Sequence, residues 1–145
     1  MALIVQKYGG TSVGDLERIK GVAQRIKRYT DLDNQVVVVV SAMSGETNRL
    51  IGLGTELAGG VPDAQEMDVL TSSGEQVAIA LLSIALGNEG VPAKSMLAEQ
   101  LGIYTDSSFG KARIEKIDLG PLKELLGSGT VPVVAGFQGV DDKGR

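Results

Sequence analysis

The run Val36-Val37-Val38-Val39-Val40-Ser41-Ala42-Met43-Ser44-Gly45 decides the fold of this chain. Five consecutive valines predict a strand, and because no polar residue interrupts them, the strand should be buried on both faces. Strands of that kind belong to parallel sheets covered by helices. The small and hydroxyl residues that follow indicate a loop at the carboxyl end of the strand, where open α/β sheets bind their ligands.

The segments on both sides of this strand alternate between strand and helix patterns. Upstream, residues 2–6 form a short apolar run before a Gly-Gly pair, and residues 15–29 carry apolar side chains at helical spacing. Downstream we expect helices at 47–57, 64–70, 74–86 and 121–126, and strands at 93–96, 102–105, 112–117 and 131–136. This order predicts an α/β fold, a three-layer αβα sandwich with a mainly parallel sheet. The polar stretch 138–145 is expected to end without returning to the core.

Composition limits the chemistry that the chain can perform. Its 145 residues carry a net charge of −4 and include no cysteine and no histidine. Thiol catalysis, disulfides, thiolate metal sites and a histidine base are therefore excluded, which leaves Lys, Arg, carboxylates, hydroxyls and backbone amides. No basic run points to nucleic acid, and no apolar stretch approaches the roughly 20 residues of a membrane span, so we expect small-molecule partners and a cytoplasmic location.

The first loop with possible chemistry is Lys7-Tyr8-Gly9-Gly10-Thr11-Ser12, directly after the first strand. Two glycines allow the backbone to approach an anion, and the following helix offers unpaired amides. The spacing fits neither a Walker A loop, because Asp15-Leu16 replace its Lys and hydroxyl residues, nor the dinucleotide glycine pattern. A plain turn in which Ser12 and Asp15 cap the helix explains the pattern equally well.

Two further loops carry hydroxyl and acidic side chains. In residues 41–48, hydroxyls and amides could hold a small polar substrate, but capping of the next helix by Ser44 or Thr47 is the favoured alternative from pattern alone. In residues 72–76, Ser72 and Glu75 match a capping box, which is again the better explanation by pattern. A functional role for Glu75 requires its carboxylate to face a cation such as an α-ammonium group.

Taken together, these segments resemble the amino acid kinase family, and within it the aspartate kinases. Five motifs occur in the order typical of the family: Lys7–Val13, Val39–Asn48, Ser73–Val77, Thr105–Ser107 and Val134–Val140. The resemblance covers almost the whole chain. It implies ATP-dependent phosphorylation of the β-carboxylate of L-aspartate, the entry step of lysine, threonine and methionine biosynthesis.

The resemblance also implies roles for residues on the phosphate side. Lys7 would be the catalytic residue, neutralising charge on the transferring phosphoryl group, and Gly9, Gly10, Thr11 and Ser12 would complete the phosphate-binding loop. Magnesium would arrive with the phosphates of ATP, and no metal ligand is expected from the chain itself.

On the substrate side, the resemblance implies that Ser41 and Thr47 hold the aspartate and that Glu75 pairs with its α-ammonium group. The attacking group is already a carboxylate and needs no general base, so the absence of histidine is no obstacle.

The resemblance further implies that residues 1–145 are the amino-terminal, substrate-side portion of an amino acid kinase domain, with the nucleotide-binding half and the regulatory ACT domains absent. Such a fragment is expected to be inactive alone and to form a homo-oligomer or associate through its truncated sheet edge. Two alternatives stay open: a sister kinase acting on acetylglutamate, glutamate or carbamate, and a non-catalytic fold fragment, truncated or designed. The loops at 41–48 and 73–75 argue against the sister kinases.

Overall fold

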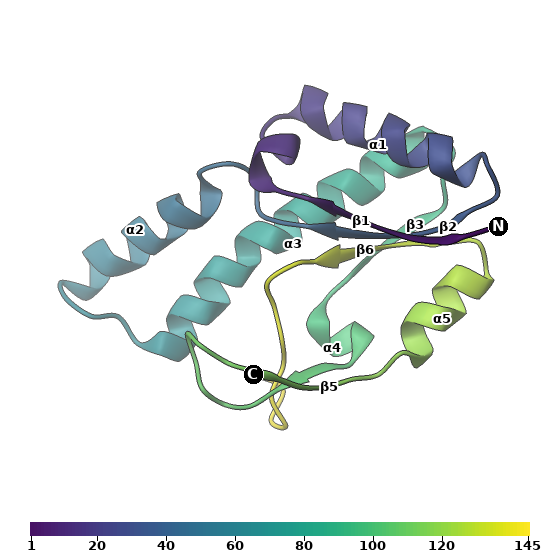
Figure 1. Cartoon of the computed structure of the whole chain (residues 1–145). Helices are drawn as coiled ribbons and strands as arrows, with labels where there is room; N and C mark the ends of the chain where they lie inside the picture. Colours follow the sequence, from purple (N-terminus) through teal and green to yellow (C-terminus); the bar gives the residue numbers. More distant parts are fainter.

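Four parallel strands form the central sheet of the computed structural model, which describes all 145 residues (Figure 1). Across the sheet the order is β1 (Leu3–Tyr8), β2 (Gln35–Val40), β6 (Val131–Ala135) and β3 (Ala93–Met96). The valine strand β2 therefore has a neighbour on each side, as its apolar run predicts. Because all four strands are parallel, their carboxyl ends lie along one edge of the sheet.

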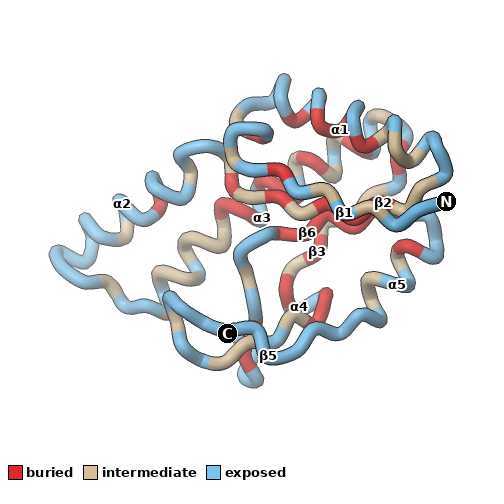
Figure 2. The backbone as a smooth tube through the Cα atoms, in the orientation of Figure 1, coloured by how far each residue is buried: buried red, intermediate tan, exposed pale blue.

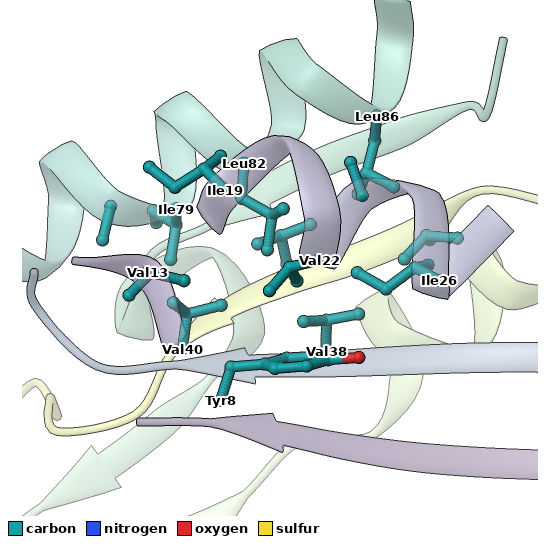
Figure 3. Packing of buried hydrophobic residues seen from close by; sticks show 14 of the residues in the cluster. Tyr8, Val13, Ile19, Val22, Ile26, Val38, Val40, Ile79, Leu82 and Leu86 are labelled. Atoms are coloured by element: carbon teal, nitrogen blue, oxygen red, sulfur yellow. The ribbon is translucent and has the colours of Figure 1, made fainter. Parts of the chain in front are cut away.

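Helices cover both faces of this sheet, which confirms the expected αβα sandwich. On one face, α1 (Leu16–Thr30) and α3 (Ala64–Asn88) pack against the even-numbered valines of β2. Figure 3 shows the side chains of α1 and α3 meeting those of β2 in this core. On the other face, α4 (Ala98–Leu101) and α5 (Gly120–Gly127) cover a smaller cluster of apolar residues. The outer strand β1 is not covered there, and its residues on that face are exposed (Figure 2).

The long helix α3 differs from the expectation of two helices at 64–70 and 74–86. Residues 71–73 continue the helix without a break, and the Ser72 hydroxyl donates to the Val69 carbonyl within it. The Ser72–Glu75 capping box is therefore wrong, because both residues lie in the interior of the helix. By length and composition alone α3 could span a membrane. In this fold, however, it supplies core residues such as Ile79 and Leu82.

The remaining elements extend from one end of the sandwich. Helix α2 (Glu46–Ala58) projects from the body and packs against α3 (Figure 1). Strands β4 (Ile103–Thr105) and β5 (Ile114–Ile117) form a separate antiparallel pair. The segment after β6 does return to the protein interior, contrary to expectation, since the buried Val140 exchanges backbone hydrogen bonds with β4.

Candidate active site

Three loops meet at the carboxyl edge of the sheet. The Ser41 amide donates to the Tyr8 carbonyl at 3.1 Å, and the Ser44 amide donates to the Gly10 carbonyl at 3.1 Å. On the other side of β2, the Gly136 amide donates to the Val40 carbonyl at 2.9 Å. The loops after β1, β2 and β6 are therefore in direct contact, as the parallel topology requires.

The loop after β1 forms a short 3-10 turn, η1 (Gly10–Val13), held to the core by the buried Val13. A Cβ atom at Gly10 would lie 2.9 Å from the Ala42 carbonyl oxygen, so a glycine is needed for the two loops to touch. A Cβ atom at Gly9 would meet nothing within 4 Å. Gly9 therefore borders open space, as a loop that approaches a ligand should.

The helix-cap alternative for this loop is correct only in part. The Asp15 carboxylate caps α1 by accepting a hydrogen bond from the Arg18 amide at 2.8 Å. Ser12 is not part of that cap, because it lies in η1, where its amide donates to the Gly9 carbonyl. The hydroxyls of Thr11 and Ser12 are exposed and form no hydrogen bond within the chain. They are free to bind a ligand.

Lys7 lies at the end of β1, beside Val39, and is exposed. It belongs to the face of the sheet opposite to Tyr8, which is buried beneath α1 (Figure 3). None of the ion pairs of the chain includes Lys7. Its ammonium group is thus available for an anion at the sheet edge.

The loop after β2 enters α2 without a side-chain cap. Gly45 is the capping residue and has a φ angle of 79°, a conformation that favours glycine. Neither Ser44 nor Thr47 caps the helix, so the structural alternative for both hydroxyls is wrong. Ser41, Ser44 and Thr47 make no side-chain hydrogen bond, whereas the Ser73 hydroxyl is engaged by the Leu70 carbonyl. No buried side-chain polar atom in the chain lacks a partner, so the free hydroxyls are open to solvent.

Glu75 is the buried acidic residue of the site, with 7% of its surface exposed. Its Oε2 atom accepts a 2.7 Å hydrogen bond from the Phe137 amide, in the loop after β6. Burial raises the pKa of Glu75, and the Phe137 hydrogen bond lowers it only in part. No salt bridge neutralises this carboxylate, while Glu46 nearby is paired with Arg49 at 2.7 Å. Glu75 is therefore an unpaired acidic group that could bind a cationic group of a ligand.

The turn of α3 that carries Glu75 packs against the loop after β2. A Cβ atom at Gly74 would lie 3.5 Å from the Ala42 side chain and 3.2 Å from Cγ of Glu46. The structure thus brings Glu75 to the same edge as the loops at 9–12 and 41–47. The sequence motif Val134–Val140 includes Phe137 and Gln138 but predicted no role for them; the Gln138 side chain donates to the Met96 carbonyl at 3.2 Å. Their position directly after a strand was the available signal.

The Thr105-Asp106-Ser107 motif has a structural role in this fold. The Asp106 carboxylate accepts hydrogen bonds from the Ser108 and Arg113 amides, which makes a turn. Ser107 donates to the buried Asp141, which also accepts from the amide and the guanidinium group of Arg145. No group of three or more acidic residues in the chain is placed to hold a metal ion.

Comparison with known proteins identifies the relatives of this chain. A sequence model of the amino acid kinase family matches residues 2–145. An aspartokinase of Pseudomonas aeruginosa is 57% identical over 145 residues, and one of Thermus thermophilus is 49% identical over the same length. The match covers all of this chain but only 35% and 36% of those proteins. The chain thus spans about a third of the length of its curated relatives.

Solved structures agree with the sequence comparison. The aspartate kinase from Synechocystis superposes with a TM-score of 0.79 at 47% identity, covering 94% of this chain and 22% of that one. Aspartokinase III of Escherichia coli, in complex with aspartate and ADP, also gives a TM-score of 0.79, at 23% identity, covering 100% of this chain and 42% of that one. The second likeness concerns the fold alone.

Proposed function

The chain belongs to the amino acid kinase family, and from this premise we propose that it forms the aspartate-binding side of an aspartate kinase active site. The observation that carries the proposal is the meeting of three loops with unpaired polar groups at the sheet edge. The similarity to aspartate kinases over the full length of the chain supports it. No feature of the site favours acetylglutamate, glutamate or carbamate as the substrate, or a non-catalytic role.

In the proposed reaction a β-carboxylate oxygen of L-aspartate attacks the γ-phosphorus of ATP. The bond between that phosphorus and the β–γ bridging oxygen breaks, and aspartyl phosphate and ADP are formed. The nucleophile is anionic at neutral pH, so no residue must remove a proton. Catalysis therefore depends on positioning and on neutralising charge, which hydroxyls, amides and a lysine can provide.

We propose that Lys7 balances the charge on the transferring phosphoryl group. The amides of Gly9 and Gly10 would donate to the phosphate oxygens, which Gly9 can approach closely because it borders open space. The free hydroxyls of Thr11 and Ser12 add hydrogen-bond donors. A magnesium ion that accompanies the nucleotide would neutralise further phosphate charge. The supporting observation is that none of these side chains is committed to the fold.

For the substrate side we propose that Ser41 and Thr47 bind the aspartate, and that Glu75 pairs with its α-ammonium group. Both hydroxyls are free in the structure, and neither is needed as a helix cap. The Glu75 carboxylate is buried and has no cationic partner. An ammonium ion beside it would compensate an otherwise unpaired charge in a poorly solvated place.

The chain spans about a third of the length of its relatives, so we propose that residues outside 1–145 complete the ATP site. The 145-residue chain alone should transfer little phosphate. Because aspartate and ATP are metabolites of the cytoplasm, we propose that the protein acts there, in lysine, threonine and methionine biosynthesis.

Strand β1 is an open sheet edge with Leu3 and Val5 exposed, and we propose it as a surface for pairing with a further strand.

A chimaeric enzyme tests the function. Residues 1–145 would replace the matching segment of the Pseudomonas aeruginosa aspartokinase, to which they are 57% identical. We expect ATP-dependent phosphorylation of aspartate, and none of acetylglutamate or glutamate. Activity on either of the latter acids but not on aspartate would contradict the proposal. The unmodified aspartokinase is the control for expression and assay conditions.

Binding by the 145-residue chain provides a second test. In an NMR titration, L-aspartate should shift the amide signals of residues 41–47 and of Phe137, because these surround the proposed subsite. N-acetyl-L-aspartate, which lacks the ammonium group, should leave the Phe137 signal unchanged. Equal shifts with both ligands would show that Glu75 does not recognise the ammonium group.

A further inference from the structure

The loop after β1 has its carbonyl oxygens bound by donors of the chain itself. The Gly9 carbonyl accepts a hydrogen bond from the Ser12 amide at 3.0 Å, and the Gly10 carbonyl accepts one from the Ser44 amide at 3.1 Å. In a trans peptide the N–H group points away from the carbonyl that shares its plane. The amides of Gly10 and Thr11 share their peptides with these two carbonyls and are therefore directed away from those donors, as binding of an anion by the loop requires.

The third consecutive carbonyl of the loop, that of Thr11, is bound by a side chain. Nη1 of Arg18, in the first turn of α1, donates to it at 2.6 Å. Asp15, the capping residue of α1, holds Arg18 from the other side: its carboxylate accepts from the Arg18 amide at 2.8 Å and lies 3.6 Å from Nε. Arg18 therefore bridges the loop and the helix, and it restricts the conformations open to the peptide between Thr11 and Ser12.

This bridge contributes little to the stability of the fold. The Arg18 side chain is 59% exposed, and polar contacts of such exposed groups add little to the free energy of unfolding. The loop is attached to the core by Val13, which is fully buried. Arg18 also borders an open cavity of about 340 Å³ that the residues with free hydroxyls, Thr11 and Ser12, line as well. The bridge therefore affects mainly the shape of the loop beside this cavity.

We propose that Arg18 is a positioning residue for phosphoryl transfer: its hydrogen bond to the Thr11 carbonyl holds the loop of residues 9–12 in the conformation that receives the phosphoryl group. This inference rests on the proposed function, in which the loop binds phosphate. Arg18 acts through the loop and does not touch the reacting atoms. Phosphoryl transfer depends on the placement of donors, and a displacement of about 1 Å can lower a rate about 100-fold. Loss of the bridge should therefore lower kcat.

Arg18→Met in the chimaeric aspartokinase tests this role. The substitution keeps a good helix former with an apolar stem and removes the guanidinium group. We expect kcat to fall roughly 10- to 100-fold, while KM for aspartate and the unfolding temperature stay nearly unchanged. Arg18→Lys, whose ammonium group can still donate to the Thr11 carbonyl, should recover most of the lost rate. A rate for Arg18→Lys as low as that of Arg18→Met would overturn the proposal, as would a change in KM for aspartate alone.

Arg25→Met is the matched control. Arg25 lies about two turns further along α1 and lines the same cavity, but no hydrogen bond or ion pair joins its side chain to the loop. The substitution removes the same charge from the same side of the helix, so kcat should stay within about twofold of that of the unmodified chimaera. Equal losses in Arg18→Met and Arg25→Met would assign the effect to positive charge in general and overturn the proposal.

Amide hydrogen exchange in the 145-residue chain, followed by NMR, tests the bridge without the reaction. Arg18→Met should raise the exchange rate of the Ser12 amide several-fold, because that amide belongs to the peptide that Arg18 holds. The Val38 amide, in the buried centre of β2, should exchange as before. Unchanged exchange at Ser12 would overturn the proposal.

Failure of the proposed function has a different signature. A chimaera that does not phosphorylate aspartate even with Arg18 in place would contradict the function itself. An active chimaera whose Arg18→Met variant is equally active would contradict only the role of Arg18.

Discussion

The Glu75 carboxylate and the Phe137 amide are joined by a 2.7 Å hydrogen bond across 62 residues of sequence. This contact fixes the loop after β6 to the middle of α3, and it leaves the second carboxylate oxygen without a cation. A carboxylate that is buried without a cation destabilises the fold unless something compensates it. We expect that its retention here reflects binding rather than stability.

Replacement of Glu75 separates these two roles. Glu75→Gln keeps an oxygen for the Phe137 amide and removes the charge, so we expect aspartate binding to fall at least about tenfold while stability at pH 7 is retained or raised. Glu75→Ala leaves the Phe137 amide without its partner and should lower the free energy of unfolding by about 1–3 kcal/mol. Denaturant unfolding and aspartate titration measure the two effects.

The pH dependence gives the sign of the charge effect. Burial raises the pKa of Glu75, so the native state holds this proton more tightly than the unfolded state does. Ionisation of Glu75 then opposes folding at neutral pH, and its unfavourable contribution disappears as pH falls through the raised pKa. The unmodified chain should therefore gain stability relative to Glu75→Gln over that range. A loss over the same range would show that the carboxylate is stabilised when ionised.

The two glycines of the first loop should respond differently to a methyl group. Gly10→Ala places a Cβ atom 2.9 Å from a backbone oxygen, which cannot move without displacing the second loop. We expect a loss of about 1–3 kcal/mol in the free energy of unfolding. Gly9→Ala meets open space at a φ angle of −76°, so its effect on stability should stay within about 0.5 kcal/mol.

If Gly9→Ala proved as destabilising as Gly10→Ala, the contact between the first two loops would not be what requires glycine. Urea unfolding of both variants decides this. In the chimaeric enzyme, Gly9→Ala should still weaken ATP turnover, because its methyl group faces the space proposed for the phosphate.

Lys7 should matter for phosphate transfer and not for stability. Its ammonium group takes part in no ion pair, so Lys7→Ala should leave the unfolding temperature of the chain unchanged. In the chimaeric enzyme the same change should lower kcat by about 100-fold or more, the usual effect of removing one charge-stabilising donor. Lys94→Ala removes an exposed lysine near the amino end of β3 and is the matched control. Equal losses in both variants would indicate a general charge effect.

Local patterns predicted the sheet and the first helix but not the long helix. An uninterrupted run of five valines indicates a strand buried on both faces, and the apolar spacing at 15–29 indicates a helix buried on one face, so both can be recognised from local sequence. Ser72 and Glu75 also match a local pattern, the capping box, yet α3 continues through both residues. The reason lies far away in sequence: Gly74 packs against the loop after β2, and Glu75 bonds Phe137. A local sequence pattern cannot indicate contacts with residues so distant in the chain.

The same limit applies to the functional loops. Hydroxyls at the start of a helix suggest caps, and only the structure shows that Gly45 caps α2 and leaves Ser44 and Thr47 free. The predicted pairing of Ser12 with Asp15 is correct only in part, since Asp15 alone caps α1 and Ser12 lies in η1. The roles proposed for Lys7 and Glu75 came from the resemblance, and they stay predictions until the variants are measured.

Asp141 should stabilise the loop at 105–109 in a pH-dependent way. It is buried and, although burial alone would raise its pKa, hydrogen bonds from Arg145, Ser107 and Lys143 lower that pKa from 3.8 to about 2. A carboxylate whose pKa is lower in the native state stabilises the fold above its unfolded pKa, and this contribution is lost as pH falls. Asp141→Asn should therefore lower the unfolding temperature at pH 7.

The difference between Asp141→Asn and the unmodified chain should shrink as pH falls from about 4 to 2, because over this range the carboxyl group gains its proton more readily in the unfolded state than in the native state. Thermal unfolding followed by circular dichroism at several pH values measures it. Asp142→Asn, at the exposed neighbouring position, removes the same charge without these hydrogen bonds and should show no such dependence. The difference in unfolding temperature between Asp141→Asn and the unmodified chain could instead persist unchanged at pH 2. In that case ionisation of Asp141 would not be the source of the stability, and the substitution would act only by changing the shape and hydrogen bonding of the side chain.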